Sequence, residues 1–364
     1  MRYRTLGTTG IQVSPYCLGA MMFGEWGNPD HDDSVRIIHR ALDAGINFID
    51  TADVYSQGES EEIVGKALKG RRDSVVLATK VHGQMKPGAG GSAQVDDPNR
   101  QGNSRRWITY EVDESLRRLQ TDYIDLYQIH RPDPRTDVGE TLSVLSDLVH
   151  SGKIRAFGSS TFPAEEIVEG QWTAERRGLE RFTCEQPPYS LLARGVETGV
   201  LPTCERYGIG VIAWSPLAGG WLTGRYRKGQ DIDMSMGRAQ RIPARFDPSM
   251  PANQRKLEVV EDLARLAEEE GVSFTHLSIA FVIAHPAVTA AIIGPRTMEQ
   301  LDDLLAGSKV ALSDDILDRL DQMVPPGVTM NAADAGWEPP SIAQAWRRRR
   351  PQGLRAATDE SAGT

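Results

Sequence analysis

The sequence of 364 residues predicts a closed barrel of eight parallel strands with a helix after each strand, the architecture of a (β/α)8 or TIM barrel. Eight short apolar runs alternate with segments of helical periodicity, and this alternation is typical of a parallel sheet. An open doubly wound sheet is the competing architecture. No G-x-G-x-x-G follows the first strand, however, so the barrel is favoured.

The order of the elements follows from their periodicity. The expected strands lie at residues 16–19, 47–50, 75–80, 124–129, 154–158, 181–185, 208–213 and 288–293. The expected helices lie at residues 33–44, 59–69, 104–119, 137–150, 163–172, 199–207, 254–270, 274–285 and 298–306. Gly45, Gly152 and Gly208 mark three helix ends, because glycine commonly stops a helix in the left-handed conformation.

Three segments interrupt the repeat within the barrel. Residues 3–13 predict a short hairpin that closes the bottom of the barrel. Residues 82–103 and 217–252 predict long loops after the third and seventh strands. Barrel enzymes build their substrate pockets from loops on this side of the strands.

The C-terminal part is expected to lie outside a barrel domain of residues 1–325. Residues 326–345 form an extension that folds back either over the mouth of the barrel or along its side. Residues 346–364 contain four consecutive arginines followed by a polar end, and they are expected to be a disordered tail.

Composition excludes several classes of partner. Lys plus Arg is 41 and Asp plus Glu is 50, a net charge of −9, which argues against nucleic-acid binding because that needs clustered positive charge. The longest apolar run, residues 277–284, is too short to cross a membrane. Cys17, Cys184 and Cys204 are odd in number and widely spaced, so reduced thiols and a cytoplasmic location are expected.

Titratable side chains occur at the ends of three successive strands. Asp50 ends the second strand and Tyr55 follows it, Lys80 ends the third strand, and His130 follows the fourth. Each alone has a structural explanation, such as a helix cap or a buried histidine. Neighbouring parallel strands lie about 5 Å apart, however, and their carboxyl ends meet on one face of a barrel. The four side chains are therefore expected to converge.

Such a convergence suits protonation of a carbonyl oxygen. A lysine ammonium group lowers the pKa of a neighbouring phenol, and a carboxylate keeps that lysine charged. A tyrosine in this setting can protonate a developing alkoxide, while an imidazole polarises the carbonyl group. No metal-ligand set is evident in the sequence, and the hydride has to come from a nicotinamide or flavin cofactor.

The later strand ends offer contacts for such a cofactor. Ser160, Thr161 and Gln186 follow or end the fifth and sixth strands, and their hydroxyl and amide groups can hold a carboxamide. Trp214 presents a flat face for stacking on a ring, although plain packing explains it equally well. Arg296 precedes a helix and suits a phosphate, although a surface charge is an equal alternative.

In this order, the motifs resemble those of the aldo-keto reductases over residues 1 to about 325. The matching segments are residues 45–52 with Tyr55, 78–80, 128–130, 158–160, 213–217 and 293–296, followed by Gln300 and Leu301. The resemblance implies a (β/α)8 barrel that binds NADPH in extended form and reduces an aldehyde or ketone. It also implies that Asp50, Tyr55, Lys80 and His130 form a catalytic tetrad, with Tyr55 as the general acid.

The resemblance further implies a set of cofactor contacts. Ser160 and Gln186 would hold the nicotinamide carboxamide, and Trp214 would stack on the nicotinamide ring. The residues implied to bind NADPH or NADP⁺ are Ser160, Thr161, Gln186, Trp214, Ser215, Pro216, Leu217, Gly219, Gly294, Arg296, Gln300 and Asp303.

Arg296 would meet the 2′-phosphate of the adenosine, which favours NADP over NAD, and Gln300 and Asp303 would lie near the adenine. Two positions depart from the pattern of the family. Thr161 and Asp303 stand where the family usually has asparagine. The first removes a contact to the carboxamide, and the second adds negative charge near a phosphate.

The substrate itself is not named by the sequence. Phe23 and Trp26, together with the two long loops, are expected to line a pocket that favours an apolar or sugar-like carbonyl compound. One alternative is an NADPH-binding regulatory or partner-binding module with little turnover. Another is a Schiff-base enzyme that uses Lys80, which needs a neutral lysine and is disfavoured by Asp50. The sequence does not indicate an oligomeric state.

Overall fold

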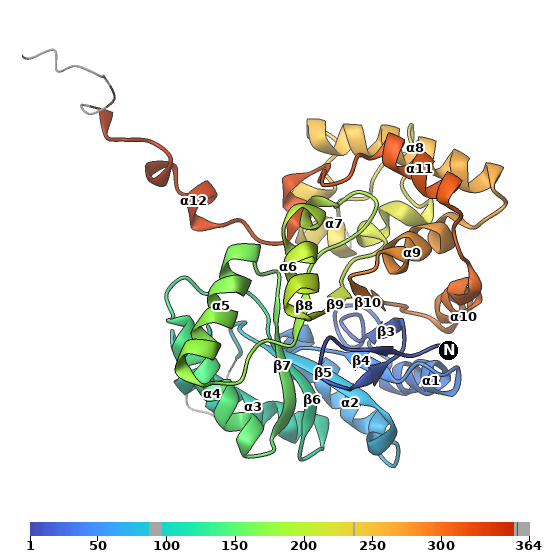
Figure 1. Ribbon diagram of the computed structural model, residues 1–364. Coiled ribbons are helices and arrows are strands. Elements are labelled where there is room, and N and C mark those ends of the chain that lie inside the picture. Colours follow the sequence, from blue (N-terminus) through green and yellow to red (C-terminus); the bar gives the residue numbers. More distant parts are fainter. Residues whose placement is uncertain (87–96, 236, 353–354, 356–364) are drawn as a thin grey trace, which may run out of the picture.

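The computed structural model describes residues 1–86, 97–235, 237–352 and 355. Eight parallel strands close into a barrel in the order β10-β3-β4-β5-β6-β7-β8-β9, and helices surround them (Figure 1). The strands are β3 (Tyr16–Gly19), β4 (Phe48–Asp50), β5 (Val76–Val81), β6 (Ile124–Ile129), β7 (Ile154–Ser160), β8 (Cys184–Gln186), β9 (Gly210–Ala213) and β10 (Val288–Ile293). The predicted (β/α)8 barrel is therefore confirmed.

The strands lie where they were predicted, and only their ends differ. The largest shift is in β8, which begins at Cys184, three residues later than expected. The ring of Phe182 packs against that of Phe157 with centroids 5.7 Å apart, in the core between strands and helices. The carbonyl oxygen of Phe182 accepts a hydrogen bond from Gln171 Nε2 at 2.8 Å. The side chain of Gln171 thus binds a carbonyl oxygen that would otherwise be available to extend the strand.

In the described part of the chain all nine predicted helices are present, together with three that were not predicted, at residues 237–241, 314–323 and 340–343. They are α1 (His31–Asp43), α2 (Glu59–Leu68), α3 (Arg105–Leu119), α4 (Val138–His150), α5 (Ala164–Arg177), α6 (Val200–Tyr207), α7 (Gly237–Arg241), α8 (Pro251–Glu269), α9 (Phe274–Ala284), α10 (Met298–Ala306), α11 (Asp314–Met323) and α12 (Pro340–Ala343). α5 runs five residues beyond its predicted end, and α11 was missed although Ser313 caps it at Ile316 N. No helix in the described part of the chain has the length and apolarity that a membrane span requires.

The N-terminal hairpin closes one end of the barrel. β1 (Arg4–Thr5) pairs antiparallel with β2 (Gln12–Val13), as predicted. Leu6 between them is fully buried and packs into the interior cluster of the barrel. Gly7 has φ +54°, and a Cβ there would lie 2.6 Å from the Gly208 carbonyl oxygen. Glycine at this position therefore lets the hairpin backbone approach the barrel directly.

The segment after α11 folds back across the loops that follow β8 and β9. The Met330 amide donates to the Leu192 carbonyl oxygen at 3.0 Å. Asp334 forms ion pairs with Lys256 at 2.6 Å and with Arg245 at 3.7 Å. Beyond this attachment, α12 extends away from the barrel (Figure 1). The sequence left two courses open for residues 326–345, over the mouth of the barrel or along its side. The first part of this extension lies over the mouth.

Candidate active site

The four predicted catalytic residues come together at the mouth of the barrel. Lys80 Nζ lies 2.6 Å from Asp50 Oδ2 and donates to the Thr51 carbonyl oxygen at 2.8 Å. The same ammonium group lies 3.4 Å from the Tyr55 hydroxyl. The Tyr55 and His130 rings meet edge to face with centroids 5.7 Å apart. Asp50, Lys80 and Tyr55 thus form one connected chain, and His130 stands beside its outer end.

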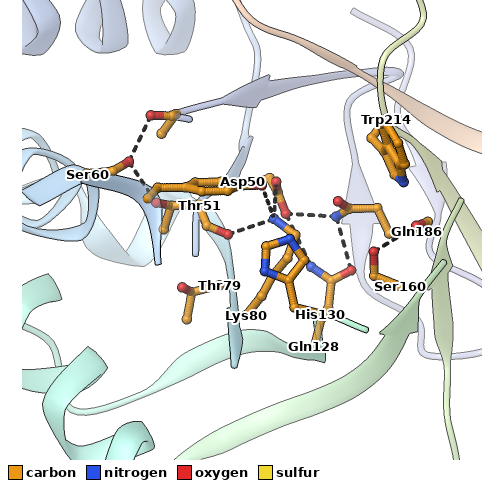
Figure 2. A network of polar contacts seen from close by, with 12 residues as sticks. Asp50, Thr51, Ser60, Thr79, Lys80, Gln128, His130, Ser160, Gln186 and Trp214 are labelled. Atoms are coloured by element: carbon orange, nitrogen blue, oxygen red, sulfur yellow. Dashed lines mark hydrogen bonds and ion pairs between the residues drawn. The ribbon is translucent and has the colours of Figure 1, made fainter. Parts of the chain in front are cut away.

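Asp50 is held on both of its oxygen atoms. The ammonium group of Lys80 occupies Oδ2, while Oδ1 accepts from Gln186 Nε2 at 2.9 Å and from Gln128 Nε2 at 3.2 Å. Figure 2 shows the lysine and the two amides converging on the carboxylate. This fixed arrangement keeps the carboxylate aligned with Lys80.

Lys80 is charged although it is fully buried. Burial alone lowers the pKa of a lysine, but the Asp50 carboxylate and the Tyr55 hydroxyl outweigh it, so the pKa of Lys80 lies above its usual value. Because a Schiff-base nucleophile needs the neutral amine, this environment disfavours that role. It favours a lysine that stabilises negative charge on the phenol of Tyr55.

His130 has the opposite electrostatic setting. Burial, together with the nearby charges of Arg131 and Lys80, holds the pKa of His130 well below its usual value. The imidazole is therefore neutral at neutral pH, and it can offer a ligand a hydrogen bond but not a positive charge.

The chain is strained next to Tyr55. Ser56 and Gln57, within the 3-10 turn η1 (Tyr55–Gly58), have φ values of 47° and 55°. Left-handed φ angles are unfavourable for residues with a side chain and commonly occur at functional sites. Ser56 Oγ accepts from the Trp26 amide at 3.1 Å, which ties this turn to the loop after β3.

A cavity of about 1180 Å³ opens from this group. Many of the residues singled out in the sequence line it: Asp50, Tyr55, His130, Trp26, Ser160, Gln186, Trp214, Ser215, Pro216, Leu217, Gly219, Gly294, Arg296, Gln300 and Asp303. Lys80 lies beneath the lining, and Thr161 lies beside it. Phe23 is fully buried in the core, so the structure does not place it against a substrate. The Phe23 amide donates to the Ala20 carbonyl oxygen, and within this turn Met21 and Met22 line the cavity while the Phe23 ring packs into the core.

At the inner end of the cavity, Ser160, Gln186 and Trp214 are neighbours. Ser160 Oγ donates to the Gln186 carbonyl oxygen at 2.9 Å. The side-chain nitrogen of Gln186 is committed to Asp50 and Gln128, which leaves its oxygen as the acceptor that faces a ligand. A Cβ at Gly336, in the C-terminal extension, would lie 2.5 Å from the Trp214 ring. The extension therefore packs against this indole.

Thr161 takes a different position from its predicted one. Its Oγ1 accepts from Trp214 Nε1 at 3.3 Å and from Arg131 Nη1 at 3.2 Å. Its φ of +61° is one that a β-branched residue rarely adopts and that asparagine adopts more readily. The threonine thus orients Trp214 and Arg131 instead of lining the cavity.

At the outer end, Ser215, Gly219 and Arg296 line one continuous wall. Arg238 Nη1 lies 3.5 Å from Ser215 Oγ, and φ at Gly219 is +73°. Arg296 stands directly before α10, where exposed amide groups and the helix dipole favour an anion. His276 Nε2 lies 2.8 Å from the Asp303 carbonyl oxygen and 3.2 Å from Asp303 Oδ1.

Comparison with known proteins agrees with this geometry. The family model described as "Aldo/keto reductase family" matches residues 15–325. The chain belongs to the aldo-keto reductase family. An uncharacterized oxidoreductase of Bacillus subtilis, YrpG, is 39% identical over 89% of this chain and 96% of its own.

Other members of the family carry diverse names. A versiconal hemiacetal acetate reductase of Aspergillus parasiticus is 35% identical over 88% of this chain and 96% of its own. A protein of Arabidopsis thaliana named "Probable voltage-gated potassium channel subunit beta" is 34% identical over 89% of this chain and 97% of its own. The relatives of this chain therefore include a protein named as a reductase and a protein named as a probable channel subunit.

Sequence reasoning missed five arginines that line the cavity: Arg131, Arg225, Arg238, Arg241 and Arg245. Arg131 directly follows His130, so its position beside the strand end was a usable signal. The other four lie in the loop after β9, where no periodicity indicates which side chains turn inward.

Proposed function

We propose that this aldo-keto reductase reduces an aldehyde or ketone to an alcohol with NADPH, and that Tyr55 is the general acid. The observation that carries the proposal is the buried chain from Asp50 through Lys80 to Tyr55, which ends at the cavity beside a neutral His130. A structural ion pair alone does not require a phenol and an imidazole at the bottom of a large cavity.

In this mechanism, the carbonyl oxygen lies between the Tyr55 hydroxyl and the His130 imidazole. His130 donates a hydrogen bond that polarises the carbonyl group. Tyr55 transfers its proton to the oxygen as negative charge develops there. The ammonium group of Lys80, 3.4 Å from the phenol oxygen, stabilises the resulting phenolate, and Asp50 keeps Lys80 charged and in place.

The cavity suits a nicotinamide dinucleotide. Its volume of about 1180 Å³ exceeds the ~300–1,000 Å³ of an ordinary small-molecule pocket, which leaves room for a dinucleotide and a substrate. The Gln186 side-chain oxygen and Ser160 would hold the carboxamide, and the Trp214 ring would stack on the nicotinamide. When bound, the cofactor supplies the hydride.

The preference for NADP over NAD rests on Arg296. This guanidinium group stands at the start of α10 and lines the outer end of the cavity beside Gln300. A planar guanidinium group matches a phosphate through paired hydrogen bonds, whereas a ribose hydroxyl gains much less from it. The 2′-phosphate of NADPH would therefore lie against Arg296, and the reaction would run where that cofactor is kept reduced.

The test is consumption of NADPH by the purified protein with a panel of aldehydes and ketones, with Tyr55→Phe measured in parallel. Removing the acidic hydroxyl is expected to lower kcat by a factor of about 10²–10⁴, while the Kd for NADPH stays within about twofold. A Tyr55→Phe variant with undiminished kcat would contradict the role of Tyr55.

A second candidate is a cofactor-binding module with little turnover, favoured by the similarity to a protein named as a channel subunit. It predicts tight NADPH binding, negligible NADPH consumption across the panel and a stable protein partner. Fast, Tyr55-dependent consumption would exclude it.

A further inference from the structure

The cavity contains more arginine than a neutral carbonyl compound needs. Arg131, Arg225, Arg238, Arg241 and Arg245 line it in addition to Arg296, in a chain with a net charge of −9. Arg245 is paired with Asp334 at 3.7 Å. Within residues 1–86, 97–235 and 237–352, the other five arginines form no ion pair with a carboxylate. Guanidinium groups cannot lose their charge at neutral pH, so this part of the cavity stays positive.

The proposed cofactor accounts for some of this charge. Arg238 lies 3.5 Å from Ser215 Oγ, and its Nη1 would lie 3.7 Å from a Cβ at Gly219. Both of those residues are among the cofactor contacts that the resemblance implies, and they line the cavity together with Arg296. Arg238 and Arg296 are thus the arginines placed to meet the phosphates of NADPH.

Arg241 follows Arg238 by three residues in α7, and it lines the cavity with its side chain exposed to solvent. Its guanidinium group stacks on Trp26 at 5.0 Å, and the Trp26 ring packs against Tyr55 with centroids 6.0 Å apart. Within the part of the chain that the structure describes, its one side-chain hydrogen bond runs from Nη2 to the thioether sulfur of Met22 at 3.9 Å. Because a thioether is a weak acceptor, most hydrogen-bond donors of Arg241 remain available to a ligand.

Arg131 lines the same cavity beside His130. Its Nη1 donates to the His130 carbonyl oxygen at 2.6 Å and to Thr161 Oγ1 at 3.2 Å. Its guanidinium group also lies 5.8 Å from the Trp214 ring. Its Nε and Nη2 donate no hydrogen bond within the described part of the chain, so they are free to meet an anion.

The carboxylates of the cavity do not balance these arginines. The exposed carboxylates that line the cavity are those of Glu25, Asp231, Asp233 and Asp303. Water and salt screen their charge, and the same screening acts on the exposed Arg225 and Arg241, whereas Arg131 and Arg238 are half-buried. Asp233 is already satisfied by the amide and hydroxyl groups of Ser235. The net attraction at the catalytic end is therefore toward an anion.

We propose that the carbonyl substrate carries an anionic group, a carboxylate or a phosphate, which Arg241 and Arg131 bind. The substrate's carbonyl oxygen lies at the same time between Tyr55 and His130. This inference rests on the proposed reductase function and adds the substrate class to it. The anionic group takes no part in the reaction and only orients the carbonyl carbon.

Two matched pairs of substrates test the inference. The first compares 4-carboxybenzaldehyde with the methyl ester of the same acid, and the second compares glyceraldehyde 3-phosphate with glyceraldehyde. A charge-assisted hydrogen bond is expected to raise kcat/KM for the anionic member by about tenfold or more. The pair with the larger ratio identifies carboxylate or phosphate as the preferred group.

Arg241→Gln is the decisive variant. It is expected to reduce the anionic preference to less than about threefold, while kcat/KM for the neutral aldehydes stays within about twofold. Arg227→Gln is the matched control, because Arg227 lies in the same loop, pairs with Glu261 and does not line the cavity. The control is expected to keep the preference.

Three outcomes would overturn the inference. One is equal kcat/KM within both pairs while neutral aldehydes are still reduced in a Tyr55-dependent way, which leaves the reductase proposal intact. Another is a rise of about tenfold in the Kd for NADPH in Arg241→Gln, which assigns this arginine to the cofactor. If nothing is turned over, tryptophan fluorescence of the NADP⁺ complex compares the binding of 4-carboxybenzaldehyde and its ester directly, and equal affinities refute the anion site.

Discussion

Asp50 and Asp53 lie three residues apart, yet they belong to two different groups of buried charges. Asp50 pairs with Lys80 at the floor of the cavity. Asp53 is also fully buried, but its neighbours are the carboxyl groups of Glu61 and Glu111 and the guanidinium group of Arg118. The first group faces a ligand, whereas the second lies among α2, α3 and the strands.

The second group contains the carboxyl groups of Asp53, Glu61 and Glu111 and a single guanidinium group, that of Arg118. Arg118 pairs with Glu61 at 2.6 Å and also with Glu111. Burial and the neighbouring carboxylates raise the pKa of Asp53 well above its usual value, and burial raises that of Glu111 to about 7. Excess negative charge is thus removed by protons held in the folded protein.

The cavity instead has an excess of positive charge, and a change of protonation cannot remove it. An arginine stays protonated at any physiological pH, so the excess positive charge of Arg131, Arg238 and Arg241 persists until an anion binds. Buried carboxyl groups can thus be neutralised within the folded protein by protons that they retain. Arginines that line a cavity without an ion pair instead indicate a ligand.

Arg118→Met is the change expected to have the largest effect on this comparison. It leaves Glu61 buried without its counterion, which is expected to lower the free energy of unfolding by about 3–5 kcal/mol. Urea denaturation, monitored by circular dichroism, measures this change in the free energy of unfolding. Arg241→Gln, on the cavity side, is the control and is expected to change stability by less than about 0.5 kcal/mol. A loss below 1 kcal/mol in Arg118→Met would show that the acidic group needs no counterion.

Glu111→Gln sharpens the comparison through pH. Because the pKa of Glu111 is raised to about 7 in the folded protein, the native state keeps its proton at pH values where the unfolded chain has lost it. The free energy of unfolding of the unmodified protein therefore falls as pH rises from about 4.3 to about 7. The variant is expected to show a smaller fall.

The control for this pH experiment is Glu114→Gln. Glu114 lies on the same helix and 4.0 Å from Arg118, but it is partly exposed. It is expected to keep the pH slope of the unmodified protein. A Glu111→Gln variant with an unchanged slope would place the retained proton elsewhere.

The two groups also differ in how far the sequence predicts them. The parallel barrel places the carboxyl end of every strand on one face, so Asp50, Lys80 and His130 were predicted to converge from strand ends alone. Arg238 and Arg241 could not be placed, because their loop has no repeat and their direction depends on Ser215 and Trp26 across the cavity.

Phe23 also shows that the direction of a side chain in a loop could not be predicted from the sequence. Its loop was identified correctly as part of the pocket, but the turn after Ala20 directs the ring into the core, while Trp26 reaches the cavity. The cofactor, the cytoplasmic location and the roles of the individual site residues stay predictions.

The smallest expected effect belongs to Thr161→Asn. Thr161 has φ +61°, and asparagine tolerates this left-handed conformation better than a β-branched residue. The amide oxygen of asparagine can still accept from Trp214 Nε1 and Arg131, so the cavity wall is expected to keep its shape. The free energy of unfolding should rise by at most about 1 kcal/mol.

Cofactor binding provides the second readout of this substitution. The added side-chain amide is expected to supply a further contact to the nicotinamide carboxamide, and the Kd for NADPH should fall by about two- to fivefold. Thr161→Val is the matched control, because it keeps the β-branched shape and removes only the hydroxyl group that orients Trp214 and Arg131. If Asn destabilises the protein as much as Val does, the hydroxyl contacts outweigh the backbone strain, and the arginine beside His130 depends on threonine for its position.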